Sequence, residues 1–378
     1  MTIGKFKLHH YINYIVIGVL TAVLGGIVLS GGRFDNSLLF LLEKIAISII
    51  LAVSLSLVVG FLGELSLGHA GFMCVGAYIG GKVAALLVPT LGNGPLAFII
   101  ALLAGSGAAA ICGVIIGIPA LRLRGDYLAI VTLAFGEIVK SLFQNSSDES
   151  FGGSLGLDTP RYDKNTLFII ALVLLLGCLA VIQNLIRSKH GRAITSIRDN
   201  EIAARATGIN VTKYKLSVFT IAAFFAGIAG VLYSASNYTV QSTKFGYNYS
   251  IEILVMVVLG GMGSINGSII AATLVTVLDV KLQTILTGDL AVLQDLLYAL
   301  VLIVLVIYNN APALKNFRET HSLKALWYKI TKKGDPANQG DDEAKWDRVP
   351  TKIEMNEVLS VELQPQQSTV NPDRKGAK

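Results

Sequence analysis

Residues 187–215 read RSKHGRAITSIRDNEIAARATGINVTKYK, a polar and basic stretch between two apolar runs of a hydrophobic chain. Loops rich in Lys and Arg that flank membrane spans stay on the cytoplasmic side, because positively charged loops resist translocation. We therefore expect this stretch to face the cytoplasm, and its position fixes the direction in which the neighbouring segments cross the membrane.

The same stretch predicts a short helix near residues 200–207. Asp199 or Asn200 can cap its start, and Glu201 suits its first turn. Gly208 can end it in the left-handed conformation. A helix of about two turns is not stable alone in water. It needs a docking surface, either on the rest of the protein or on a cytoplasmic partner.

The composition indicates a membrane protein. Of the 378 residues, 53% are hydrophobic and 15% are charged, and the mean hydropathy is +0.63. A soluble domain has about 25% charged residues. The net charge of +6 comes from Lys and Arg in loops beside apolar runs and in the C-terminal tail. This arrangement favours anionic membrane lipid as the partner and argues against binding of nucleic acid.

Apolar runs give the candidate membrane spans. The uncharged runs of near-spanning length are residues 11–32, 45–63, 95–120, 166–186, 216–238 and 290–307. Further runs, shorter or interrupted by Gly, Pro or charge, are residues 65–88, 127–143, 250–263 and 264–286.

Charge placement supports counting all of these runs as crossings. With Lys5 and Lys7 in the cytoplasm, the count puts Arg122 and Arg124 inside as well. The acidic region 148–163 then falls outside, and the basic stretch quoted first returns to the cytoplasm. All basic loops thus lie on one side of the membrane.

The late block 250–286 must cross twice, because only an even number of crossings after Lys215 returns the basic tail to the cytoplasm. Its break is expected near residues 260–263. The first arm of about 13 residues reaches only about 20 Å, short of the roughly 30 Å hydrocarbon core. We therefore expect an all-α membrane protein with about ten membrane segments, several short or broken and lining a central pathway, and with both termini cytoplasmic.

The sequence divides into three regions. Residues 1–311 form the predicted polytopic membrane domain, with its cytoplasmic loop at 187–215. In residues 312–333, apolar and basic side chains recur at helical spacing, which predicts an amphipathic helix beside the membrane. Residues 334–378 are polar, with mixed charge and scattered Pro, and are expected to be a disordered cytoplasmic tail.

The chain offers no convincing nucleotide-binding loop. Residues 76–83, GAYIGGKV, have the spacing of a phosphate-binding loop, but Val83 stands where a Ser or Thr would contact magnesium. The segment also lies inside an apolar run. Any ATP hydrolysis is therefore expected on another polypeptide.

Catalytic and metal-binding patterns are equally weak. His69 has only Glu64 at ligand spacing. Cys74, Cys112 and Cys178 lie in apolar runs without metal-ligand spacing and are interpreted as small buried hydrophobic residues. We expect no cofactor, no metal and no enzymatic activity.

Two carboxylates, Glu137 and Asp279, fall inside candidate spans, where an ionisable group costs about 2.5–3.5 kcal/mol on insertion scales. They have two interpretations. As hydrogen-bond partners between helices they would only stabilise packing. As proton or sodium sites they would indicate an ion-coupled secondary transporter.

Five segments, in order along the chain, resemble the motifs of one family. They are GELSLGHAGFMCVGAY at 63–78, LRLRGDYLAIVTLAFGE at 121–137, GGSLGL at 152–157, the stretch from GRA to GIN at 191–210, and GGMGSING at 260–267. Together they resemble the permease subunits of branched-chain amino acid ABC importers of the LivM type. The resemblance covers about residues 38–308.

This resemblance implies a type II ABC importer permease in a bacterial plasma membrane. Its partners would be a second permease subunit, two cytoplasmic ATPases and an extracytoplasmic solute-binding protein. An ABC permease for urea or short amides, and the secondary transporter above, stay open as alternatives.

The resemblance also implies roles for named residues. The ATPase-contacting residues would be Asp199, Asn200, Glu201, Ile202, Ala203, Arg205, Ala206 and Gly208. Candidates for the translocation pathway are Glu64, Ser66, Gly68, His69, Gly71, Thr132, Glu137, Gly260, Gly261 and Gly263. The outer loop that would receive the binding protein contains Gly152, Gly153 and Gly156.

Overall fold

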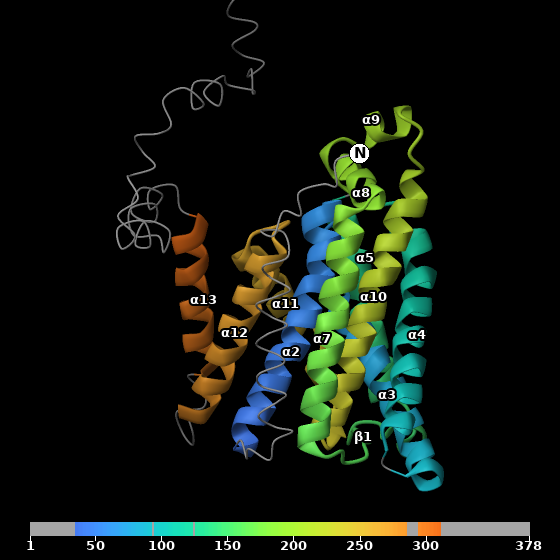
Figure 1. Ribbon diagram of the computed structural model, residues 1–378, viewed down its shortest axis with the longest axis vertical. Helices are drawn as coiled ribbons and strands as arrows, with labels where there is room; N and C mark the ends of the chain where they lie inside the picture. Colours follow the sequence, from blue (N-terminus) through green and yellow to red (C-terminus); the bar gives the residue numbers. More distant parts are fainter. Residues whose placement is uncertain (1–34, 93, 124, 286–293, 311–378) are drawn as a thin grey trace, which may run out of the picture. The chain divides into compact units, whose positions relative to one another are not determined.

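The computed structural model describes residues 35–92, 94–123, 125–285 and 294–310, which are almost entirely helical (Figure 1). The long helices are α2 (Asn36–Ser56), α3 (His69–Leu91), α4 (Pro95–Ala120), α5 (Asp126–Gln144), α7 (Lys164–Arg187), α10 (Val211–Ser236), α11 (Tyr247–Gly260), α12 (Ile265–Ile285) and α13 (Gln294–Asn310). Shorter elements are the π-helix η2 (Leu57–Leu62), α6 (Asp148–Phe151), α8 (Lys189–Asp199), α9 (Glu201–Ala206), the 3-10 helix η3 (Ser242–Phe245) and the strands β1 (Leu157–Asp158) and β2 (Thr239–Val240).

The helices confirm the predicted segments within the described residues. Among these residues, six helices are long and apolar enough to cross a membrane. The predicted late pair of segments is present as the short α11 followed by α12, with the turn at the expected glycines. The first predicted span, the juxtamembrane helix at 312–333 and the tail at 334–378 lie outside the described residues.

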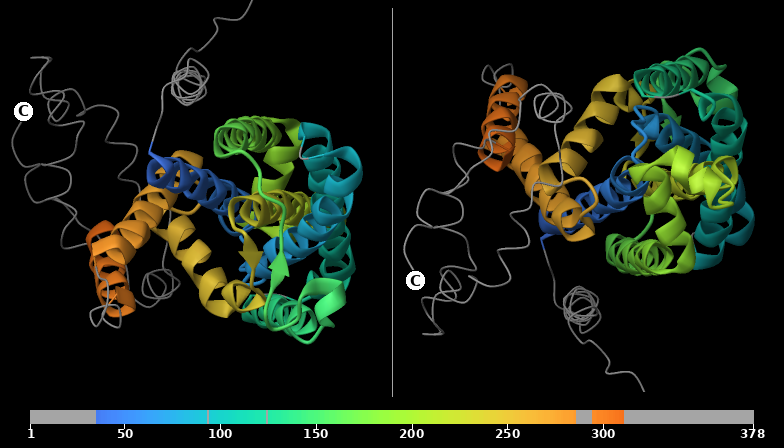
Figure 2. Two further views of the ribbon diagram at one scale, coloured as in Figure 1. Left: turned by 90° about the horizontal axis from the view of Figure 1, so that it is seen from below. Right: turned by 90° about the horizontal axis from the view of Figure 1, so that it is seen from above.

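Close helix packing is built on glycine. Helix α10 packs against α2, α3, α4 and α7, and the view along the helices places it among them (Figure 2). A Cβ on Gly76 would lie 2.4 Å from the carbonyl oxygen of Gly227, and one on Gly230 would lie 2.1 Å from that of Met73. The segment 76–83 is therefore a helix face in contact with α10, and does not form a phosphate-binding loop.

The two ends of the helices differ. Helices α8 and α9 lie at one end, and β1 lies at the other (Figure 1). β1 pairs with β2 in antiparallel register, with Leu157 opposite Val240. The basic stretch and the acidic outer region thus lie at opposite ends, as the charge argument requires.

The basic stretch contains more helix than predicted. α8 was not expected, and α10 begins at Val211, earlier than the predicted start of its span. Ser188 caps α8 by accepting hydrogen bonds from the backbone amides of His190 and Gly191, and Ile194 and Ile197 are buried against the membrane helices. The polar composition of this stretch hid an amphipathic helix with a narrow apolar face.

Candidate coupling site and membrane break

The predicted short helix is present as α9. The side-chain oxygen of Asn200 accepts a hydrogen bond of 3.0 Å from the backbone amide of Ala203, which identifies Asn200 as the cap. Asp199 instead ends α8 and pairs with Arg198 at 3.0 Å. Gly208 has a φ of +86° and stops the helix as expected.

One face of α9 is exposed. Ala204 is buried, whereas Ile202 is 74% exposed and Ala203, Arg205 and Ala206 are also exposed. An isoleucine this exposed, at the end of the helices that is predicted to be cytoplasmic, suits a protein partner, because water gives no favourable surroundings to its side chain.

A buried lysine joins α9 to the membrane helices. Lys215, one turn into α10, is only 4% exposed. Its ammonium donates hydrogen bonds to Glu64 and, over 3.2 Å, to Glu201. Glu201 also accepts a hydrogen bond of 2.7 Å from Arg205. The first residue of α9 is therefore held in a chain of ion pairs that ends at Glu64.

Glu64 belongs to a break in the membrane structure. α2 continues into η2, Gly63 ends it with a φ of +80°, and the chain has no regular structure until α3 begins at His69. The backbone amide of Leu67 donates to the Thr132 hydroxyl over 3.0 Å. Irregular backbone is tolerated at membrane depth where protein satisfies its polar groups, as this contact does.

Arg198 of α8 contacts the same break. Its guanidinium donates a 3.1 Å hydrogen bond to the carbonyl oxygen of Gly60, inside η2. A Cβ on Gly63 would lie 2.6 Å from the Arg198 Cγ. The absence of a side chain at Gly63 thus allows α8 to rest on the end of η2.

The late glycine turn packs against η2 as well. A Cβ on Gly60 would lie 2.4 Å from the backbone nitrogen of Gly263. Gly261 and Gly263 have φ of +88° and +84°, and a Cβ on Gly260 would lie 2.4 Å from the carbonyl carbon of Gly267. These glycines are explained by the turn and by backbone contact.

Most pathway candidates near the break are buried inside the chain. Ser66, His69 and Thr132 are all at most 2% exposed. The His69 ring forms a 2.7 Å hydrogen bond with the Ser54 hydroxyl. A Cβ on Gly68 would lie 2.5 Å from the Thr132 carbonyl oxygen, and one on Gly71 would lie 2.8 Å from the Cα of Gly136. In this conformation these residues pack α3 against α2 and α5.

The carboxylates within spans have partners. Glu137 pairs with Lys140 at 3.0 Å and accepts a hydrogen bond of 2.7 Å from the backbone amide of Tyr247. Asp279 pairs with Lys44 at 3.0 Å. These contacts join α5 to the start of α11 and α12 to α2, which favours the packing interpretation.

The outer glycines shape a tight loop. Gly152, Gly153 and Gly156 have φ of +76°, +49° and +96°. A Cβ on Gly152 would lie 1.9 Å from the Gly156 carbonyl oxygen. The loop leads into β1 and leaves Leu155 77% exposed.

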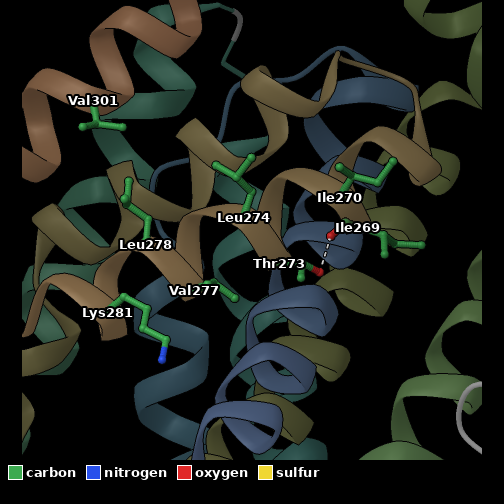
Figure 3. A pocket seen from close by; sticks show the side chains of 8 residues that line it. All are labelled: Ile269, Ile270, Thr273, Leu274, Val277, Leu278, Lys281 and Val301. Carbon is green, nitrogen blue, oxygen red and sulfur yellow. Dashed lines mark hydrogen bonds between the residues drawn. The ribbon is translucent and has the colours of Figure 1, made fainter. Parts of the chain in front are cut away.

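The cavity of about 600 Å³ in Figure 3 is a poor site for a polar solute. Apolar side chains of α12 and Val301 of α13 line it. Its polar members are Lys281 and Thr273, and the hydroxyl of Thr273 already donates to the carbonyl oxygen of Ile269. Such a groove suits lipid or an apolar helix.

The signals for Lys215 and Arg198 were missing from the sequence. Both lie in a stretch full of basic residues, and only the folded helices show which of these cations contact the break. The spacing of Glu201 and Arg205 does predict a pair, because residues four apart are neighbours on a helix.

Comparison with known proteins agrees with this architecture. Residues 37–307 match the family described as branched-chain amino acid transport system / permease component. The chain belongs to this family. It is thus a multi-pass, all-α membrane permease of the type II ABC importer class, and its resemblance to the LivM type is confirmed.

Individual relatives point the same way. The chain is 39% identical to the high-affinity branched-chain amino acid permease LivM of Salmonella typhimurium over 61% of its own length and 60% of the relative's. It is 37% identical to LivM of Escherichia coli over 70% of its own length and 67% of the relative's. The ribose import permease RbsC of Escherichia coli is 28% identical over 73% of the chain and 86% of RbsC. The chain thus spans roughly two thirds of the LivM relatives.

Proposed function

We propose that this chain is the membrane-spanning permease subunit of an ATP-driven importer for branched-chain or related amino acids. The observation that carries the proposal is the exposed α9, tied by Lys215 to a break between membrane helices. The two relatives whose names specify branched-chain amino acids are more similar to the chain than the ribose permease is.

The proposed partners follow from the surfaces of the two ends. The assembly would contain two cytoplasmic ATPases, and α9 would sit in a groove of one of them. Ile202, Ala203 and Ala206 would pack in this groove, and Glu201 and Arg205 would make polar contacts. Asp199, Asn200 and Gly208 would fix the geometry of the helix.

At the outer end, an extracytoplasmic solute-binding protein would dock on the loop of Gly152, Gly153 and Gly156. A second permease subunit would complete the translocation pathway, with the segment 63–71, Thr132, Glu137 and the 260–263 turn near it. Both termini would be cytoplasmic, in a bacterial plasma membrane. The chain itself would hydrolyse no ATP.

Copurification tests the proposal. Tagged chain isolated from its own cells in mild detergent should carry an ATPase and a second permease. After reconstitution with the binding protein, the complex should take up leucine with ATP inside the vesicles and should not do so without ATP. Ribose and urea serve as competing solutes for the cargo assignment.

The opposite result would favour secondary transport. Uptake by the purified chain alone under a proton or sodium gradient would overturn the proposal, and Glu137→Gln and Asp279→Asn would then identify the coupling residue. The ion pairs of both carboxylates with lysines argue against that outcome.

A further inference from the structure

Three parts of the cytoplasmic end, distant in sequence, meet at one short segment of the chain. Lys215 contacts Glu64, Arg198 contacts the Gly60 carbonyl, and Gly263 packs on the backbone of Gly60. Residues 57–68 are therefore contacted by α8, the start of α10 and the α11–α12 turn, and α9 is linked to them through Lys215.

The Lys215 ammonium is the most constrained of these contacts. It is buried, and its two partners, Glu64 and Glu201, are themselves largely shielded, with side chains 12% and 19% exposed. A buried charge that loses one partner is strongly destabilised, because no water replaces the lost hydrogen bond. Displacement of Glu201 must therefore either carry Lys215 along or be opposed by it.

Residues 57–68, to which Lys215 would transmit a displacement of Glu201, have features of a segment that changes shape. η2 is a π-helix, a rare form that is common at functional sites, and its end at Gly63 is followed by irregular chain up to Gly68. The buried hydroxyls of Ser56 and Ser66 have no hydrogen-bond partner among the described residues. A buried hydroxyl without a partner is costly, so a rearrangement of this segment that pairs it would gain free energy.

We propose that Lys215 is a positioning residue that couples α9 to the 57–68 segment through the Glu201–Lys215–Glu64 ion pairs, with Arg198 as a second link through Gly60. The proposal rests on the proposed function, since it assigns α9 to an ATPase. Movement of α9 is transmitted to η2 and the start of α3, and from Gly60 to the α11–α12 turn. These contacts thus connect the ATPase to both broken regions of the membrane domain, the 57–68 segment and the α11–α12 turn.

Lys215→Met and its neighbour Lys213→Met form the decisive comparison, since Lys213 lies on the same helix and is exposed. Both are prepared as the complete reconstituted complex. Lys215→Met should retain the ATPase and its basal ATP hydrolysis but lose at least about tenfold in leucine uptake and in stimulation by solute-loaded binding protein. Lys213→Met should match the unchanged complex, and Lys215→Arg should recover most of the uptake.

A second variant guards against misfolding. Arg198→Gln removes the second link through Gly60 and leaves both ion pairs of Lys215 in place. Because Arg198 is exposed, this variant should assemble, and it should reduce uptake in the same uncoupled manner. Uptake and stimulation equal to those of Lys213→Met in either assembled variant would overturn the inference. An equal fall in basal hydrolysis and uptake would also overturn it, because that pattern indicates general damage. Failure of any ATPase to copurify with the unchanged chain would instead reject the proposed function.

Discussion

Gly63 combines two requirements that no other residue type meets. Its φ of +80° lies in the left-handed region, and its missing side chain leaves room for Arg198. We expect Gly63→Ala to destabilise the protein by at least about 2 kcal/mol, because backbone strain of about 1–2 kcal/mol adds to a steric clash. The apparent melting temperature of the purified protein in detergent measures the effect.

Gly208→Ala is the matched control. Gly208 has a similar φ of +86°, but nothing lies within 4 Å of an added Cβ. Its substitution should therefore lower the melting temperature less, by the backbone strain alone. Equal effects of the two substitutions would mean that Arg198 does not rest on Gly63.

Single residues also show what the sequence predicts and what it does not. The Asn200 cap and the Gly208 stop follow from residue type alone, since few residues perform these tasks well. Lys213 and Lys215 are alike in the sequence, but one is exposed and the other is buried. Which cation is buried depends on the face that α10 turns to Glu64, and that face is fixed only by packing of segments 151 residues apart.

At the scale of elements, the exposed face of α9 should be the docking surface. Ile202→Asp replaces the exposed apolar side chain with a charge that an apolar groove would have to desolvate. We expect this substitution to reduce ATPase copurification at least about tenfold, equivalent to 1.4 kcal/mol. Pull-down of the tagged chain with immunoblotting of the ATPase measures the loss.

Leu155→Asp provides the control, because Leu155 is similarly exposed but shortly precedes β1, which lies at the other end of the helices (Figure 1). It should leave copurification of the ATPase unchanged. If Ile202→Asp also leaves it unchanged, α9 does not carry the contact.

Helix packing yields a second prediction at this scale. Gly230→Ala should destabilise the protein by about 1–3 kcal/mol, because its Cβ would lie 2.1 Å from the Met73 carbonyl oxygen and would force α10 away from α3. Gly177→Ala, in α7 with nothing within 4 Å, should be neutral or slightly stabilising, since alanine favours helix. Thermal denaturation in one detergent compares the two, and similar melting temperatures would refute close α3–α10 contact.

Element boundaries were predictable where strong signals stand in the sequence. Residues 95–120 were predicted as a span and form α4, which begins at Pro95 after a glycine. The run 65–88 was less well predicted, since α3 begins only at His69. Hydropathy does not distinguish the irregular segment before His69 from helix, because its Leu residues are as apolar as those of a span. The π-helix is likewise set by contacts with Arg198 and Gly263, which lie far away in the sequence.

At the scale of the whole molecule, the predicted orientation follows from the placement of charge. The basic α8–α9 region and the outer loop before β1 lie at opposite ends of the helices (Figure 1). The single predicted crossing between these two regions, by α7, accounts for this without any knowledge of side-chain contacts. The cargo cannot be predicted in this way, because the buried residues around the break do not identify which solute passes.

Labelling from either side of the membrane tests that orientation. Ile202→Cys should react with a membrane-impermeant maleimide only after cells are opened, and Leu155→Cys should react in intact cells. Both positions are exposed, whereas Cys74 and Cys178 are buried. The half-buried Cys112 is replaced by Ala in both variants to remove its background. Labelling of Ile202→Cys in intact cells would place α9 outside and would contradict every step from Lys215 to an ATP-driven mechanism.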